Sequence, residues 1–179
     1  MEHRDHVRLI GRGVRGAGPV WADLGSGRGA FTLALADLLL SEGRESATIH
    51  SVDRDGAALR DQAREVARRF PAVALIVHAA DFTRPLPIPT LDGLVMANAL
   101  HFVHDPAPVL ELVHGYLRPG GRLVLVEYDA ERGNAWVPFP ISWRRWPGLA
   151  EAAGFNGTRE IGRVPSRFLG SIYASVSEA

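Results

Sequence analysis

A glycine-rich turn near the start of the chain is the first place where residue types and spacing suggest a chemical role. Asp23 is followed by Gly25, Gly27 and Gly29, and then by an apolar, helix-like segment. Glycines let a chain turn tightly and let its backbone approach a ligand closely. A G-x-G-x-G run is weak by itself, because any strand–helix crossover can use glycines for packing. Its place between a short apolar run and a helix favours a nucleotide-binding turn.

Polar residues also follow three later apolar runs. Asp53 ends the second run, where its carboxylate can accept hydrogen bonds from both hydroxyls of a ribose. The alternative is a helix cap, although Asp55 suits that role and would free Asp53. Asp81 and Phe82 follow the third run. The Asp81 carboxylate could accept from the amino group of an adenine, and Phe82 could flank its ring. A surface-turn Asp with a Phe in the core explains the two residues almost as well. Asn98 follows the fourth run, beyond which ligands of open α/β sheets bind.

The apolar pattern predicts the elements that must position these residues. Short apolar runs predict buried strands at residues 20–24, 47–52, 73–77, 91–96 and 122–128. Periodicity and capping signals predict helices at residues 31–39, 59–70 and 105–117. Strands that alternate with helices indicate the α/β class, with a mainly parallel sheet that helices cover on both faces.

The two ends of the chain look less regular. Residues 1–19 are expected to form a short, basic, glycine-rich lead-in with a helical turn at its start. Residues 129–147 are expected to form an aromatic loop or lid, and a short helix should begin or be broken at Pro147. Residues 157–177 predict a hairpin. The 179 residues suit a single domain (1–179), since two full cores would be tight at this length.

The composition excludes several classes of chemistry. The chain has no Cys, and all 20 basic residues are Arg. The absence of Cys excludes thiolate nucleophiles and Cys-bound metals. The absence of Lys excludes Schiff-base chemistry and a Walker-type P-loop. Because 20 acidic residues balance the arginines, the zero net charge disfavours nucleic acid as a partner. No signal peptide or membrane span is apparent, so we expect no membrane partner and a cytoplasmic location.

Five segments, in order and spacing, resemble the Rossmann-like (class I) S-adenosylmethionine (SAM)-dependent methyltransferases. They cover roughly residues 20–130 and read ADLGSGRGAF, IHSVDRD, AADF, LDGLVMANALHF and YLRPGGRLVLVEYD. The resemblance implies a doubly wound, three-layer α/β/α sandwich around a mostly parallel seven-stranded sheet, with strand order 3-2-1-4-5-7-6 and an antiparallel last strand. It also implies SAM as cofactor, S-adenosylhomocysteine (SAH) as its product, and methyl transfer by in-line displacement to an acceptor, here expected to be a small molecule.

The same resemblance implies which residues hold the methionine half of the cofactor. Asp23 would hold the amino end, directly or through water. Gly25, Gly27 and Gly29 would let the loop lie against the methionine moiety and the ribose. Asn98 would face the methionine end near the reacting methyl group.

The adenosine half would be held by residues from the next two strands. Asp53 would bind the ribose hydroxyls, and Arg54 would lie over the adenine. Asp81 would accept a hydrogen bond from the adenine amino group, with the Phe82 backbone N–H as a second contact.

A general base is needed only if the acceptor starts protonated. His101, just past the fourth strand, is the main candidate because imidazole titrates near neutral pH. The alternatives are a polar rim residue or a hydrogen-bond donor to the substrate. Glu127 and Tyr128 are second candidates, although Glu127 also suits an ordinary strand-end carboxylate. A metal site at His101, His104 and Asp105 is a further alternative. Asp105 is better explained as a helix cap, and no third neutral ligand is evident, so we expect no metal.

Substrate contacts are expected after the fifth strand. Trp143 belongs to an aromatic segment that suits an apolar or planar acceptor, but packing of the last helix explains it equally well. Arg167 would suit an anionic substrate.

The short lead-in would leave the cofactor partly open or covered by a second subunit, as in a homodimer. Asn98 to His101 lacks the Asn/Asp-Pro-Pro-Tyr of enzymes that methylate nucleic-acid amino groups, which argues against that reaction.

Two rival functions stay open. An NAD(P)-dependent oxidoreductase also uses a glycine loop, and Gly25 to Ala30 satisfies G-x-G-x-x-A. Asp81-Phe82, residues 117–121 and the C-terminal hairpin favour methyl transfer instead. The second rival is a non-catalytic SAM-binding partner subunit on the same fold.

Overall fold

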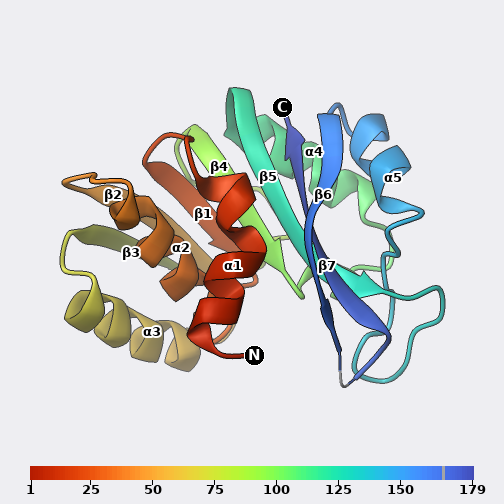
Figure 1. The fold of residues 1–179 in the computed structure, drawn as a ribbon, viewed down its shortest axis with the longest axis horizontal. Helices are drawn as coiled ribbons and strands as arrows, with labels where there is room; N and C mark the ends of the chain where they lie inside the picture. Colours follow the sequence, from red (N-terminus) through yellow and green to blue (C-terminus); the bar gives the residue numbers. More distant parts are fainter. Residues whose placement is uncertain (167) are drawn as a thin grey trace.

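Seven strands form one sheet, in the order β3-β2-β1-β4-β5-β7-β6 (Figure 1). The computed structural model describes residues 1–166 and 168–179. The strands are β1 (Val20–Leu24), β2 (Ala47–Asp53), β3 (Val73–Ala79), β4 (Leu91–Ala97), β5 (Leu117–Asp129), β6 (Asn156–Pro165) and β7 (Ser171–Glu178). Neighbours from β3 to β5 are parallel, whereas β7 runs antiparallel to both β5 and β6. This topology confirms the one that the resemblance implied.

Helices cover both faces of the sheet and complete the three layers. They are α1 (His3–Val14), α2 (Ala30–Ser41), α3 (Gly56–Arg69), the 3-10 helix η1 (Leu100–Phe102), α4 (Ala107–Tyr116) and α5 (Trp146–Ala152). The first three pack on one face, and α4 and α5 pack on the other (Figure 1). Central strands such as β4 are therefore buried on both sides, which explains their nearly continuous apolar runs. Among the described residues, no helix is both long and apolar enough to cross a membrane.

The N-terminal segment differs from the expected lead-in with a single helical turn, because residues 3–14 form a full helix. Leu9, Ile10 and Val14 are buried on its inner side. Gly13 lies so close to β5 that a Cβ atom there would be 2.6 Å from a methyl group of Val124. Its glycines lower intrinsic helix propensity, so the segment looked irregular from sequence alone. Burial against the sheet stabilises the helix instead.

Several element boundaries also differ from the sequence predictions. Helix α4 begins at Ala107 rather than at Asp105, and β5 already begins at Leu117. Helix α5 begins at Trp146, so Pro147 lies in its first turn, where a missing N–H costs nothing. The second strand of the hairpin begins at Ser171.

Strand β6 joins the sheet through β7. Within the described residues β6 pairs with β7 alone, and β7 lies between β5 and β6. Helix α1 packs across this side of the sheet, where Gly162 of β6 approaches Leu9 closely. A Cβ atom at residue 162 would lie 3.2 Å from Cδ1 of Leu9. The N-terminal helix and the C-terminal hairpin are thus parts of one packed unit.

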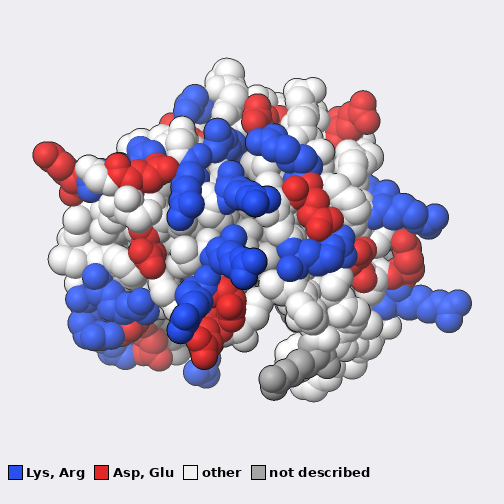
Figure 2. Space-filling view, in the orientation of Figure 1, with Lys and Arg blue, Asp and Glu red and all other residues white. Residues whose placement is uncertain are grey.

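Charge is unevenly distributed although the net charge is zero. Figure 2 shows basic side chains gathered over α1 and the neighbouring strand β6. Arg8 and Arg12 of α1 border a groove against β6, together with Arg163. Arg163 is paired with Glu160 and Asp129, and both acids raise its pKa. The patch is therefore local and partly neutralised.

Candidate active site

A cavity of about 560 Å³ opens at the carboxyl ends of the parallel strands. It is lined by Gly25, Asp53, Arg54, Phe82, Thr83, Asn98, Ala99, Phe102 and Val103. Strand order reverses between β1 and β4, and ligands of open α/β sheets bind at such a switch point. The volume lies in the range that holds one drug-sized ligand. The structure thus brings together five residues that the sequence singled out: Gly25, Asp53, Arg54, Phe82 and Asn98.

The glycine loop is held in a conformation that side chains rarely adopt. Gly25, Gly27 and Gly29 have φ angles of +73°, +51° and +83°. The Gly27 N–H donates to Oδ2 of Asp53 at 2.7 Å, which ties the loop to the end of β2. Gly25 packs directly against Ala99. The loop is therefore held in shape by contacts within the protein.

The substitution Gly25→Ala should destabilise the protein and close part of the cavity. The new Cβ atom would lie 2.5 Å from Cβ of Ala99, on a backbone with a positive φ. Overpacking and left-handed strain together should cost about 2–4 kcal/mol of unfolding free energy. Urea denaturation measures this loss. Gly27→Ala is the matched control, because its Cβ atom would meet nothing within 4 Å while φ is also positive. Equal losses in both variants would show that crowding at Ala99 is unimportant.

A buried polar network supports the glycine loop from below. Ser51 Oγ lies 2.7 Å from Ser26 Oγ and 2.5 Å from Oε1 of Gln62. Gln62 is 1% exposed, and a Cβ atom on Gly29 would lie 2.4 Å from its Cγ. Gln62 was not predicted from the sequence, because a glutamine in a strongly charged helix suggests an exposed side chain. Its position on the same helical face as Leu59 and Val66 was the available signal.

Two backbone N–H groups fix the orientation of the Asp53 carboxylate. Oδ2 accepts from Gly27, and Oδ1 accepts from the backbone N–H of Asp55 at 2.9 Å. Asp55 itself caps α3 by accepting from the N–H groups of Ala57 and Ala58. The prediction that Asp55 is the cap is therefore confirmed. Each oxygen of Asp53 keeps a further lone pair, and the residue lines the cavity.

Arg54 and Asp81 face each other at the rim of the cavity. Arg54 Nη2 donates to Oδ2 of Asp81 at 2.6 Å. Thr83 donates to Oδ1 through its backbone N–H and its hydroxyl. The Arg54 hydrogen bond, helped by Thr83, lowers the pKa of Asp81 to about 2. Arg54, Phe82 and Thr83 line the cavity, whereas Asp81 is not among the lining residues and its carboxylate is already hydrogen-bonded.

Asn98 combines backbone strain with an unused hydrogen-bond acceptor. Its φ of 52° is the only positive φ of a non-glycine residue in the described chain. Its buried Oδ1 has no hydrogen-bond partner in the part of the chain that the structure describes. Strain and orphaned polar atoms cluster at ligand sites, since a ligand can supply the missing partner. Because Asn98 lines the cavity, a donor group on a ligand would satisfy this oxygen.

Asp23 lies beneath the cavity rather than in its lining. It is 1% exposed and accepts a hydrogen bond from Oγ1 of Thr32 at 2.6 Å. Burial is the main cause that raises its pKa from 3.8 to about 7. The role of Thr32, in the first turn of α2, was not predicted, because only the packed structure shows its contact with Asp23.

The raised pKa of Asp23 predicts how stability depends on pH. The folded state holds the proton more tightly than the unfolded state, so this contribution is present below pH 4 and is lost as pH rises from about 4 to about 7. The expected loss is a few kcal/mol, at about 1.4 kcal/mol per pKa unit. Urea denaturation at pH 5 and pH 8 measures it, and Asp23→Asn should abolish the difference. If the Asp23→Asn variant kept the full pH dependence of stability, another titratable group would be its cause.

His101 and Glu127 form a buried pair next to the cavity. His101 Nδ1 lies 2.7 Å from Oε2 of Glu127, and the His101 backbone N–H donates to Oε1 at 3.1 Å. The two residues are 2% and 0% exposed. A carboxylate at Nδ1 places the proton on that nitrogen and leaves Nε2 as an acceptor. Within the described residues Nε2 has no hydrogen-bond partner. The pair has the arrangement of an oriented general base.

Aromatic rings enclose this imidazole. The ring of Phe102 lies 4.3 Å from that of His101 between centroids, and the ring of Tyr128 lies 5.5 Å away. Phe102 is 61% exposed and lines the cavity, whereas His101 is buried and does not. Tyr128 provides the second of these ring contacts to His101. Phe102 and Val103 were missed, since nothing in their local pattern distinguishes them from core residues.

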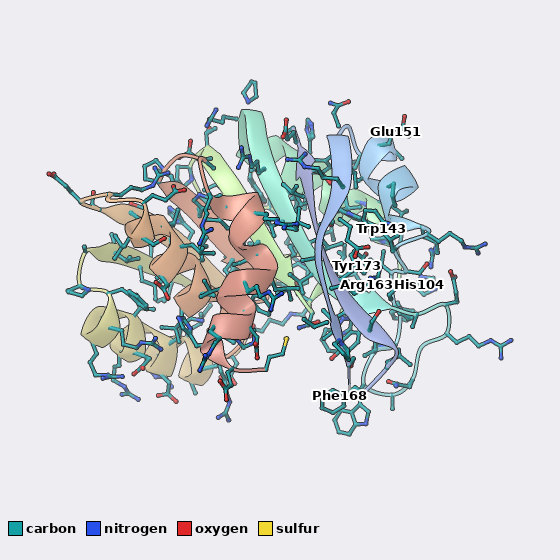
Figure 3. All side chains as sticks on the ribbon, viewed as in Figure 1. His104, Trp143, Glu151, Arg163, Phe168 and Tyr173 are labelled. Carbon is teal, nitrogen blue, oxygen red and sulfur yellow. The ribbon has the colours of Figure 1, made fainter. Side chains whose placement is uncertain are left out.

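The expected aromatic wall is not formed by Trp143. Its ring packs edge-on against Tyr173, with centroids 5.5 Å apart, and Figure 3 shows both side chains on the hairpin side of the molecule. The Tyr173 hydroxyl donates to the carbonyl of Ile141. Trp143 thus packs the segment after β5 onto the sheet, which was the alternative considered from sequence. The predicted substrate contact at Arg167 lies outside the described residues.

Comparisons with known proteins agree with this geometry. The family model described as "Methyltransferase domain" matches residues 22–125. That range contains the glycine loop, Asp53, Asn98 and His101, and it covers more than half of the chain.

The sequence of this chain is similar to part of a curated relative. A reducing polyketide synthase, grgA, from a Penicillium species is 27% identical over 168 residues. The match covers 81% of this chain and 7% of that protein, so this chain spans a small part of the curated relative's length.

Solved structures share the fold. The DszA carbon methyltransferase has a TM-score of 0.72 at 19% identity, covering 92% of this chain and 48% of that one. The 1,6-didemethyltoxoflavin-N1-methyltransferase of Burkholderia thailandensis has a TM-score of 0.71 at 22% identity, covering 98% of this chain and 77% of that one. That structure contains its substrate and S-adenosylhomocysteine.

Proposed function

The chain belongs to the methyltransferase-domain family, and we propose that it transfers the methyl group of SAM to a small-molecule acceptor. One observation carries the proposal furthest. A preformed cavity at the β1/β4 switch point lies next to a buried, oriented His101–Glu127 pair. A non-catalytic subunit has no use for that pair, whereas methyl transfer to a protonated acceptor does, and the family match favours methyl transfer over a nicotinamide oxidoreductase.

The residues that line the cavity fit SAM. Asp53 presents fixed carboxylate oxygens, which suit the two ribose hydroxyls. Asn98 presents an unpartnered oxygen, which suits the ammonium or another donor of the methionine end. A Cβ atom on Gly25 would fill the space against Ala99, and one on Gly27 would point into open space, so the backbone can lie against the ligand. When bound, SAM supplies an electrophilic methyl group on a sulfonium.

The rim of the cavity suits the adenine. Phe82 offers a ring face and a backbone N–H, and both Phe82 and Arg54 line the cavity. Asp81 would receive the adenine amino group at its remaining lone pairs or by exchange with Arg54. Asp23 lies deeper and would act on the methionine end through Thr32 or water.

The protein's own contribution to the reaction is the removal of a proton. Nε2 of His101 would accept the proton of the acceptor atom, while Glu127 holds the imidazole and stabilises its positive charge. Burial excludes water from this pair and so strengthens the interaction. Because His101 is buried, Phe102, which packs on its ring and lines the cavity, would have to move for the acceptor to reach Nε2.

The need for such a base narrows the acceptor class. A free amine or thioether offers a lone pair and needs no base, whereas a hydroxyl, a thiol or a carbon acid must lose a proton first. We favour a carbon flanked by carbonyl groups. The similarity to a polyketide synthase and to a carbon methyltransferase supports this choice. A small-molecule acceptor rather than nucleic acid agrees with the zero net charge. A homodimer and a cytoplasmic location stay predictions of the sequence.

Thermal unfolding with SAH, SAM, NAD and NADP in parallel tests the cofactor. At about 100 times its Kd, SAH should stabilise by about 2.7 kcal/mol. For a chain of this length that raises Tm by about 5–10 °C. Nicotinamide cofactors should leave Tm unchanged. Stabilisation by NAD or NADP alone would refute methyl transfer, and transfer from labelled SAM to a 1,3-dicarbonyl compound would then be absent as well.

A further inference from the structure

A second, smaller cavity of about 220 Å³ adjoins the first one. It lies under the segment of residues 131–145, between β5 and α5, and Val103 lines both cavities. His104 and Arg145 line it together with the ring of Phe139 and several prolines. The first cavity has the size of one cofactor-sized ligand. A transfer between two substrates therefore needs additional space, and the shared Val103, two residues after His101, places that space next to the first cavity.

The segment over this second cavity is held in a defined shape. The backbone N–H of Phe139 donates to the carbonyl of His101 at 3.0 Å. Oδ1 of Asn134 accepts from the N–H groups of Trp136 and Val137, each at 2.9 Å. Gly133 is pressed against Pro138, since a Cβ atom there would lie 2.3 Å from its carbonyl oxygen. The cavity is thus preformed, and it is tied directly to the residue that bears the base.

The cavity is lined by two basic side chains and one carboxylate. Oε1 of Glu131 accepts from Ser142 Oγ at 2.9 Å and pairs with Arg144 at 3.3 Å, which partly neutralises this carboxylate. By contrast, neither the guanidinium of Arg145 nor the ring of His104 has a side-chain hydrogen-bond or ionic partner among residues 1–166 and 168–179. Phe139 packs edge-on against the His104 ring, with centroids 4.9 Å apart. The cavity offers hydrogen-bond donors and apolar walls.

We propose that this cavity binds a carboxylate at the distal end of the acceptor, with Arg145 and His104 as its donors. The planar guanidinium matches a carboxylate in a bidentate arrangement. The prolines and Phe139 enclose the few atoms between the carboxylate and the reacting carbon. This inference rests on the proposed function, and it identifies the acceptor as a small anionic carbon acid.

4,6-Dioxoheptanoate and 4,6-dioxoheptanamide are suitable probes, because both have a carbon between two ketone groups and the same chain length, and only the distal group differs in charge. Isothermal titration of the SAH-loaded protein should give at least about tenfold tighter binding of the carboxylate, as one charge-assisted hydrogen-bonded pair requires. Arg145→Gln should abolish this preference without changing the Kd for SAH or the Tm. His104→Gln should reduce it in part.

Arg144→Gln is the matched control, since this neighbouring arginine pairs with Glu131 and does not line the cavity. It should keep the preference for the carboxylate. Equal losses in both arginine variants, equal affinities of the two probes, or failure of both probes to bind SAH-loaded protein would overturn the proposal. Absence of SAH binding would instead refute the proposed function, and the ratio of probe affinities on the unloaded protein would still test the carboxylate site.

Discussion

Replacing His101 by Gln should lower the turnover of methyl transfer by about 10²- to 10⁴-fold, the usual contribution of a positioned general base. Gln keeps a polar group of similar reach and can still donate to Glu127, but it cannot accept a proton near neutral pH. The Kd for SAH should stay within about twofold, because His101 does not line the cofactor cavity. Single-turnover kinetics with labelled SAM separate the chemical step from binding.

Glu127→Gln should lower the same rate constant, because an amide no longer stabilises the charged imidazole. The double variant His101→Gln/Glu127→Gln should be no slower than the His101 variant, since residues that act as a unit are not additive. His78→Gln is the control, as it changes a half-buried histidine outside the cavity lining. Near-normal turnover in the His101 variant would show that the acceptor needs no base.

Replacing Asp53 by Asn should weaken SAH binding by about 10²-fold or more. Hydrogen bonds to a charged group contribute about 1.5–3 kcal/mol each, and two ribose hydroxyls would lose them. The amide also conflicts with its surroundings, because both carboxylate oxygens accept from backbone N–H groups. An Asn side chain must turn a donor toward one of them. Isothermal titration with SAH measures the affinity, and Tm without ligand measures the cost to the fold.

Asp55→Asn is the matched control for this prediction. It removes the same charge two residues away, and Asn caps a helix as well as Asp does. Asp55 lies outside the cavity lining, so SAH binding should be retained. An equally large loss in the Asp55 variant would mean that charge near the loop, and not the ribose contact, determines affinity.

Residues whose role depends on local sequence were predictable. Strands buried on both faces give continuous apolar runs, and a polar residue at the end of such a run must lie at the ligand-binding edge of a parallel sheet. Asp53, Asn98 and the glycine loop follow this rule, and each lies at the cavity or in its loop. The sheet order followed from the family resemblance rather than from periodicity.

Roles that depend on packing between distant segments were not predictable. His101 and Glu127 are 26 residues apart, and they meet because Ala97 of β4 is in register with Val126 of β5. Nothing local distinguishes a rim histidine from one that is buried against a carboxylate. For the same reason, the aromatic segment after β5 could be interpreted as a substrate wall or as packing of the last helix. For Trp143, its contact with Tyr173 favours packing. Helix α1 was missed because burial, not propensity, stabilises it.

The position of β7 between β5 and β6 has a consequence for synthesis on the ribosome. Strand β6 is translated before β7 but has no strand to pair with until residues 171–178 emerge. Residues 130–178 must be translated after β5 before β7 can pair with it. At about 5–20 residues per second, that interval is about 2–10 s. Nascent chains that stall before residue 171 should therefore expose the edge of β5 and recruit chaperones, whereas pairing with β7 covers that edge.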